Sequence, residues 1–312
     1  MVHRPAEGTL KFAVILLLAV MIPAQIVGFL AGTDAAMAVG IAAGFTMAVT
    51  PFATTKQALG SAVLAAALAA AASLADDTAW AVAALMLVSA VLLGLTNQHS
   101  AGLMTLAPAI VIIFGPSALD MSPAASFGYV LLGGILGWIV IRAFKFQAEA
   151  NPVPQGVAWR HAIVLGVLSA VAVYWALANN VSHGYWVAVT LVVALRPLRD
   201  RVLGTLVGAL LSFVVIVWAP VWLALIVAAI CLVLLATYSM GGSYFMQTLF
   251  LTPMLLIFAT IGDEQQGITY TSERVFYTIV GVGVGVIAAW VLDRWDRAAG
   301  DLPAVEEPAT AR

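Results

Sequence analysis

Three arginines follow one another closely in a chain that carries few charges. Arg196, Arg199 and Arg201 come directly after a long apolar run, although only 9% of the residues are charged. A guanidinium group binds a carboxylate through two parallel hydrogen bonds, so these arginines would suit a mouth that attracts organic anions. The alternative is topological, because basic residues also anchor membrane helices on the cytoplasmic side and contact lipid headgroups.

An aromatic pair, Tyr185 and Trp186, opens the apolar run that ends at the arginines. Aromatic side chains concentrate at membrane interfaces, so a place in this interfacial belt is one interpretation. The other is that the rings line the outer part of a path and stack on an aromatic substrate. Thr190 follows Trp186 by one helical turn on the same face, so both would then line one stripe.

Two prolines, Pro108 and Pro253, interrupt apolar segments at corresponding positions of the chain. Matching interrupted segments indicate a transporter site, because the freed backbone groups need protein or a water-filled cavity around them. A simple kink, in which threonine satisfies the freed groups, is the alternative. The polar residues near these prolines are Thr105, Gln247, Thr248 and Thr252.

Small residues follow the arginines as Gly204-Thr205-x-x-Gly208, and Gly60-Ser61 stands at the corresponding place earlier in the chain. Small side chains let helix backbones approach closely, and Ser or Thr can hydrogen-bond between helices. We therefore expect helix packing here. Thr205 lies beside Arg201, which leaves a place on the path as its second interpretation.

The elements that must position these residues are transmembrane helices. Of the 312 residues, 63% are hydrophobic, against about 45–50% in soluble domains. A spanning helix needs about 20 mostly apolar residues, and about twelve such segments follow one another along the chain. They cover residues 10–31, 35–51, 57–75, 79–96, 101–116, 124–144, 160–179, 184–197, 202–218, 220–238, 243–260 and 274–292. The predicted fold class is an all-α integral membrane protein.

The charged residues predict the orientation of these spans. With about twelve spans, the connections that fall on one side are basic; they hold Lys56, Arg142, Lys145, Arg160, Arg196, Arg199 and Arg201. The connections on the other side are acidic, with Arg274 as their one basic residue; they hold Asp34, Asp76, Asp77, Asp120, Asp263, Glu264 and Glu273. Because basic residues mark the cytoplasmic side, both termini are predicted to be cytoplasmic.

The two halves of the sequence follow one plan. Matching motifs recur in the same order at a spacing of roughly 145–149 residues, as expected for an internal repeat. They pair Lys11 with Arg160, Leu59-Gly60-Ser61 with Leu203-Gly204-Thr205, Pro108 with Pro253, and Tyr129 with Tyr277. An even number of spans in each half predicts two parallel six-helix repeats, a plan that transporters use; a purely structural duplication is the alternative. The predicted parts are a first repeat (1–144), a cytoplasmic linker (145–159), a second repeat (160–292) and a cytoplasmic tail (293–312).

Several function classes find no support in the sequence. No span carries an acidic or basic residue near its centre, so no proton relay within the membrane is evident. There is no G-x-x-x-x-G-K-[ST] phosphate loop, no zinc-ligand spacing and no Ser-His-Asp arrangement at one depth, so we expect no enzyme, no metal and no cofactor. A single cysteine, Cys231, excludes an intrachain disulfide.

The run YWVAVTLVVALRP, followed by R-x-R-V-L-G-T-L-V-G, resembles the signature of the fusaric acid resistance (FUSC-like) and aromatic acid exporter family. Residues 160–292 resemble one membrane module of that family, and residues 10–144 keep the plan without the Tyr-Trp pair or the arginines. The resemblance implies an exporter of small organic anions, such as aromatic carboxylic acids, in the bacterial inner membrane.

The sequence thus predicts a multi-pass secondary exporter or facilitator of small organic anions. Its candidate path residues are Lys56, Thr105, Pro108, Tyr185, Trp186, Thr190, Arg196, Arg199, Arg201, Thr205, Gln247, Thr252 and Pro253. The alternatives are an anion channel and a non-transporting membrane scaffold or assembly subunit. Membrane lipid is an expected partner, a homodimer and a periplasmic adaptor are the candidate protein partners, and nothing indicates binding of nucleic acid.

Overall fold

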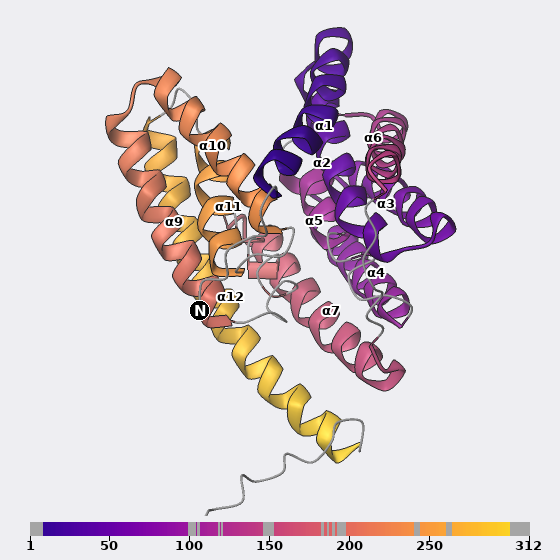
Figure 1. Cartoon of the computed structure of the whole chain (residues 1–312). Helices are drawn as coiled ribbons and strands as arrows, with labels where there is room; N and C mark the ends of the chain where they lie inside the picture. The colour runs from indigo at the N-terminus through magenta and orange to yellow at the C-terminus, as the bar shows by residue number, and fades with distance from the viewer. Residues whose placement is uncertain are drawn as a thin grey trace, which may run out of the picture.

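The computed structural model describes residues 9–98, 104, 107–117, 119, 121–145, 153–181, 184–185, 187–188, 191, 198–239, 244–259 and 264–299. Every regular element in these residues is a helix (Figure 1). The first six are α1 (Thr9–Ala31), α2 (Thr33–Val49), α3 (Thr55–Ala75), α4 (Ala79–Asn97), α5 (Ala107–Ile112) and α6 (Pro123–Ala143). The others are α7 (Gln155–Ala178), α9 (Leu198–Trp218), α10 (Val221–Ser239), α11 (Tyr244–Ala259) and α12 (Glu264–Ala298).

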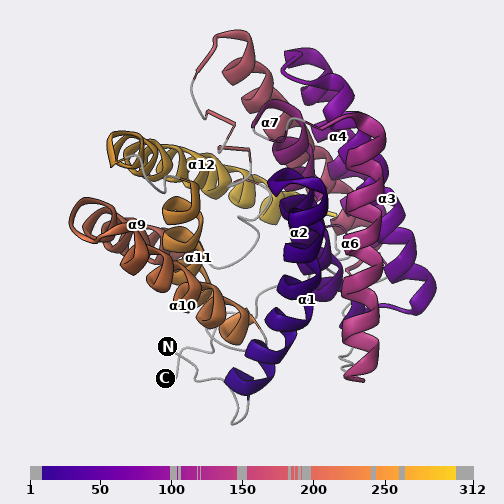
Figure 2. The same ribbon diagram turned by 90° about the horizontal axis from the view of Figure 1, so that it is seen from above.

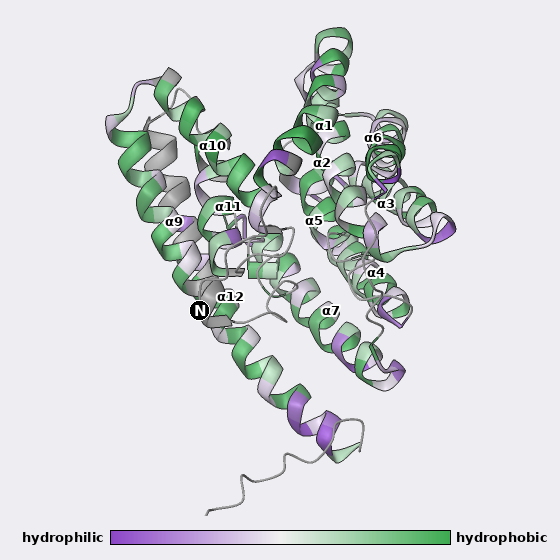
Figure 3. Ribbon diagram, in the orientation of Figure 1, coloured by the Kyte–Doolittle hydropathy of each residue, from purple (hydrophilic) through white to green (hydrophobic). Residues whose placement is uncertain are grey.

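The described helices are those of a membrane protein. Six of them are long and apolar enough to cross a bilayer: α1, α2 with the short 3-10 turn Thr50–Phe52, α3, α4, α6 and α7. Shorter apolar helical stretches cover Ala107–Pro116, Leu203–Trp218 and Ile226–Tyr238. Figure 3 shows hydrophobic residues along most of the helices and hydrophilic ones gathered at the end of α12. The all-α membrane class is confirmed, and the count of about twelve spans stays a prediction.

The interruption expected at Pro108 lies elsewhere in the structure. Pro108 is the second residue of α5, a position at which the missing proline N–H has no helical partner to lose. Instead α5 runs into the π-helical segment η2 (Ile113–Ser117), which holds Pro116 and a non-helical Gly115 (φ −93°, ψ −106°). Among the described residues the break falls at Gly115-Pro116, and a role of Pro108 on the path stays a prediction.

Two helix ends also differ from the predicted spans. Helix α7 begins at Gln155, so the last residues of the predicted 145–159 linker are helical. Pro154 caps this start, as its fixed backbone angle favours. Helix α12 continues to Ala298, and Asp296 near its end is buried. The part of the predicted tail from 293 to 298 is therefore the last stretch of a helix.

The helices form two groups, which we name the first bundle (α1 to α7) and the second bundle (α9 to α12) (Figures 1 and 2). In the first bundle, α6 packs against α2 and α3, and α7 packs along α4. In the second bundle, α11 packs against α9 and α10, and α12 packs along α9. The bundles meet where α1 contacts α10 and where α7 contacts α12.

Small residues set the close helix contacts. A Cβ on Gly94 would overlap the Ala162 side chain, and a Cβ on Gly166 would lie 2.8 Å from that of Ala90, so α4 and α7 run antiparallel. Gly133 faces Val39 and Gly137 faces Ala43, so α2 and α6 run parallel. Without a hydrophobic drive inside a bilayer, such close approach supplies the van der Waals contact that holds helices together.

Candidate functional site

The interface of α9 and α11 holds the best-defined group of predicted site residues. Gly204 lies against Thr248, and a Cβ on Gly204 would also lie 2.7 Å from the Phe245 carbonyl oxygen. Thr205 next to it is buried, with 4% of its surface exposed. The Gly-Thr-x-x-Gly motif therefore brings two backbones together, as its small residues predict.

The second glycine of the motif covers the interruption at Pro253. A proline at this position leaves the Leu249 carbonyl without its helical N–H donor. A Cβ on Gly208 would lie 2.7 Å from that carbonyl oxygen and 3.1 Å from Pro253 Cδ. Glycine at 208 thus allows α9 to close over the broken turn of α11.

The hydroxyl groups at this interface bond to their own helices. Thr252 Oγ1 donates to the Thr248 carbonyl at 3.0 Å, and Ser212 Oγ donates to the Gly208 carbonyl at 2.8 Å. Gln247 Nε2 donates to the Tyr238 carbonyl at 3.0 Å, which ties α11 to the end of α10. The Thr252 hydroxyl bonds to the Thr248 carbonyl rather than to the Leu249 carbonyl that Pro253 leaves without its donor. A role of Thr205, Gln247, Thr252 or Pro253 in transport stays a prediction.

The predicted anion mouth lies at the start of α9. Arg199 and Arg201 belong to the first turns of this helix, but their side chains lie outside the described part of the chain. Arg196, Trp186, Thr190 and Thr105 also lie outside the described residues. The arginine cluster and the stripe of Trp186 and Thr190 therefore stay predictions.

Lys56 lies exposed in the first turn of α3, and the start of this helix is held by a capping box. Thr54 caps the helix: its Oγ1 accepts from the Gln57 N–H, and its own N–H donates to Gln57 Oε1 at 2.9 Å. Arg142 at the end of α6 donates to the Ala53 carbonyl at 2.8 Å. These bonds fix the connection that carries Lys56.

Tyr185 is buried in the core of the first bundle, among Val173, Ala188 and other apolar residues. Gly184 beside it is closed in by Ala176 and Val181. Among the described residues, the chain after α7 therefore turns inward onto the first bundle. This burial departs from the lipid-facing belt that was one interpretation of Tyr185.

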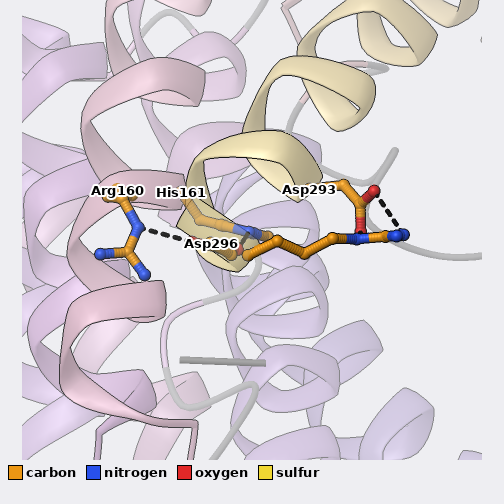
Figure 4. A network of polar contacts seen from close by, with 5 residues as sticks. Arg160, His161, Asp293 and Asp296 are labelled. Carbon is orange, nitrogen blue, oxygen red and sulfur yellow. Dashed lines mark hydrogen bonds and ion pairs between the residues drawn. The ribbon is translucent and has the colours of Figure 1, made fainter. Parts of the chain in front are cut away.

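A second polar site was missed by the sequence analysis (Figure 4). Asp296 of α12 accepts from Arg160 Nε at 2.5 Å and lies 3.2 Å from His161 Nε2, both on α7. The Asp296 side chain is 3% exposed. We name Arg160, His161 and Asp296 the Asp296 cluster. The signal for it was a buried stripe at helical spacing, Gly285, Ala288 and Leu292, which continues to Asp296 beyond the predicted end of the span.

The neighbouring ion pair of α12 is of a different kind. Arg297 and Asp293 lie four residues apart on one helix, with Arg297 NH2 2.7 Å from Asp293 Oδ2. Their side chains are about half exposed, at 50% and 44%. This pair stays within α12, whereas the Asp296 cluster joins α7 of the first bundle to α12 of the second.

The helical fold and the apolar spans of the described residues define a polytopic α-helical membrane protein. Residues 168–288 match the family model described as fusaric acid resistance protein-like. The match confirms the predicted resemblance for the part of the chain that runs from within α7 to within α12. No curated protein and no solved structure gives a significant match.

Proposed function

We propose that this protein is a secondary exporter or facilitator of small organic anions, with aromatic carboxylic acids as the substrate class, in the bacterial inner membrane. The observation that carries the proposal is the family match of residues 168–288, which contains the arginine-rich start of α9 and the proline inside α11. The exporters of that family move small acids, and guanidinium groups suit a carboxylate substrate.

The pattern of helix contacts supports a transporter built from two repeats. If α1 to α6 correspond to α7 to α12, then α3 contacts α5 and α6 as α9 contacts α11 and α12. The contact of α4 with α5 likewise has its counterpart in that of α10 with α11. The first helix of each repeat packs on the other repeat, since α7 packs on α4 and α1 contacts α10. An exchange of this kind fits parallel repeats related by an axis along the membrane normal.

The relative directions of the helices support alternate crossing of the bilayer. Helices α9 and α11 run parallel, because Gly204 faces Thr248 while Gly208 faces Thr252. Helices α3 and α6 run antiparallel, because Ser73 near the end of one contacts Ser126 near the start of the other at 2.6 Å. Both agree with one crossing per helix in chain order, and so with the proposed cytoplasmic termini.

In this account, anions enter at Arg196, Arg199 and Arg201, with Lys56 as the counterpart in the first repeat. They cross beside the α9–α11 interface at Thr205 and Pro253 and leave near Trp186. A membrane potential negative inside favours exit of a monovalent anion by about 2.3 kcal/mol per 100 mV, so no proton relay is needed. A second copy of the chain and a periplasmic adaptor are the proposed protein partners.

Efflux from proteoliposomes tests the proposal. Vesicles are loaded with radiolabelled benzoate, and release is compared for wild type, the double variant Arg199→Ala, Arg201→Ala, and protein-free vesicles. We expect wild type to release the acid faster than protein-free vesicles and the double variant to lose most of this gain. Equal release by wild type and the double variant would rule out a role of Arg199 and Arg201 as the anion mouth. Single-channel currents that reverse at the anion equilibrium potential would make the protein a channel.

A further inference from the structure

The Asp296 cluster lies where the two bundles meet, and its three side chains come from both of them. Arg160 and His161 stand in the first turns of α7, and Asp296 stands in the last turn of α12 (Figure 4). The Asp296 carboxylate receives one group on each oxygen, with Arg160 at Oδ1 and His161 at Oδ2. One buried carboxylate thus connects α7 of the first bundle to α12 of the second.

Each side of this connection is held firmly by its own bundle. Helix α7 packs along α4 through Gly94, Ala162 and Gly166, where any larger side chain would collide. Helix α12 packs along α9. Because packed helix pairs move as units, any rotation of one bundle against the other must act on the Asp296 cluster.

A buried ion pair is a poor device for stability, because removing charges from water costs about as much as their attraction returns. Its advantage is position: the bonds to Asp296 hold only while α7 and α12 keep one spacing. Van der Waals contacts between side chains, by comparison, are individually weak and depend less steeply on one exact geometry. The cluster can therefore act as a two-state contact between α7 and α12, which is either formed or broken.

We propose that Arg160, His161 and Asp296 form a gate that holds the two bundles together at the predicted cytoplasmic side and opens during the transport cycle. The role in transport rests on the proposed function, in which the bundles rock about a path between them. Asp293 and Arg297 provide the matched control, since they form an exposed carboxylate–guanidinium pair in the same turns of α12 without bridging the bundles.

A distance measurement tests the gate without any substrate. Spin labels are placed in a Cys231→Ala background at Gln155 and Ala299, both exposed, at the α7 and α12 ends that the cluster joins. Electron–electron double resonance in lipid nanodiscs compares the parent protein with Asp296→Asn and Asp293→Asn. The gate predicts a longer distance population in Asp296→Asn and none in Asp293→Asn.

Two further samples make this result decisive. The double variant Arg160→Gln, Asp296→Asn removes both charges, so no guanidinium is left facing a neutral amide, and it should show the same longer population. Labels at Thr55 and Gln155, both in the first bundle, should keep one distance in every variant. An unchanged distance between Gln155 and Ala299 in both charge-removing proteins would overturn the gate.

A reversible cross-link then tests whether the gate must open for transport. Arg160→Cys with Asp296→Cys is joined by a short bis-methanethiosulfonate reagent, and benzoate efflux is measured before and after reduction. We expect the cross-link to slow efflux by about tenfold or more, since it blocks a required conformational step, and reduction to restore it. The control pair Ser73→Cys with Ser126→Cys lies within the first bundle, so the same reagent should leave its efflux unchanged.

The two proposals fail in different ways. If wild type releases no benzoate, the proposed function fails, and the spin-label distances still decide whether the cluster holds the bundles together. If wild type releases benzoate and the cross-linked Arg160→Cys, Asp296→Cys protein releases it as fast as the reduced one, the transport gate is wrong while the proposed function stands.

Discussion

At the scale of single residues, Gly208 lets α9 approach α11, and Asp296 joins α12 to α7. The Gly-Thr-x-x-Gly spacing predicted close packing, and the structure places Gly204 and Gly208 against the backbone of α11. For Asp296, helical spacing indicates the face of α12 but not the partner side chain. Asp296 falls within the predicted cytoplasmic tail, whereas its helical spacing from Leu292 puts it on the buried face of α12. Only the position of Arg160, far away in sequence, explains why a carboxylate is buried there.

Gly208→Ala should destabilise the protein. The added Cβ would lie 2.7 Å from the Leu249 carbonyl oxygen, so α9 and α11 must separate, and overpacking of this kind costs about 1–3 kcal/mol. Gly283→Ala is the control, because no atom lies within 4 Å of its added Cβ and alanine is the better helix former. Thermal unfolding in detergent should show a lower melting temperature for the first variant only. Equal melting temperatures would mean that the α9–α11 approach is looser than described.

Asp296→Ala and Asp293→Ala should differ strongly in stability. Loss of Asp296 leaves the largely buried Arg160 guanidinium without this carboxylate, and breaking a buried pair costs about 3–5 kcal/mol. The Asp293 pair is half exposed, so its loss costs about 0–1 kcal/mol. Denaturant unfolding of the two variants side by side measures this difference. Similar values for both would show that Asp296 is hydrated in solution.

At the scale of helices, composition predicted the spans closely wherever they are uninterrupted. Apolar runs bounded by polar or small residues fixed α1, α3, α4 and α6 to within a few residues. The positions of the helix breaks were harder to predict. A proline disturbs a helix only where its missing N–H would have bonded to a carbonyl of the preceding turn. Pro253 lies inside α11, whereas Pro108 lies at the start of α5, and Gly115-Pro116 makes the break instead.

Pro253→Ala should stabilise α11 and impair transport. Alanine restores the N–H donor for the Leu249 carbonyl, and an interior proline costs a helix about 3 kcal/mol. If the broken turn belongs to the path, the repaired helix should release benzoate more slowly. Pro23→Ala in α1 is the control, since Pro23 also lies inside a helix but away from the α9–α11 interface; it should raise stability and leave efflux unchanged. Unimpaired efflux in Pro253→Ala would make its kink purely structural.

At the scale of the whole molecule, the repeats predicted from the sequence and the bundles seen in space do not share a boundary. The predicted second repeat begins at 160, but α7 packs on α4 of the first bundle (Figure 2). The matching motifs that predict the repeats do not indicate which half a helix packs against. The contact of α4 with α7 depends on Gly94 and Gly166, which are distant in sequence and lie outside the matched motifs.

A truncation experiment follows from this exchange of helices. A fragment of residues 1–191 keeps α7, so the small-residue face of α4 stays covered. A fragment of residues 1–152 exposes that face, and we expect it to self-associate because uncovered small-residue faces drive helix contacts. Size-exclusion chromatography in detergent should give one sharp peak for the longer fragment and higher oligomers for the shorter one. The reverse order would show that the first repeat folds without α7.

The central claim is that the protein carries organic anions outward across a membrane. The most direct test is release of radiolabelled benzoate from proteoliposomes on which a potassium diffusion potential, negative inside, is imposed. We predict protein-dependent release that saturates with internal benzoate and accelerates as the potential grows, since each 100 mV is worth about 2.3 kcal/mol per charge. Release equal to that of protein-free vesicles at every potential would contradict the account.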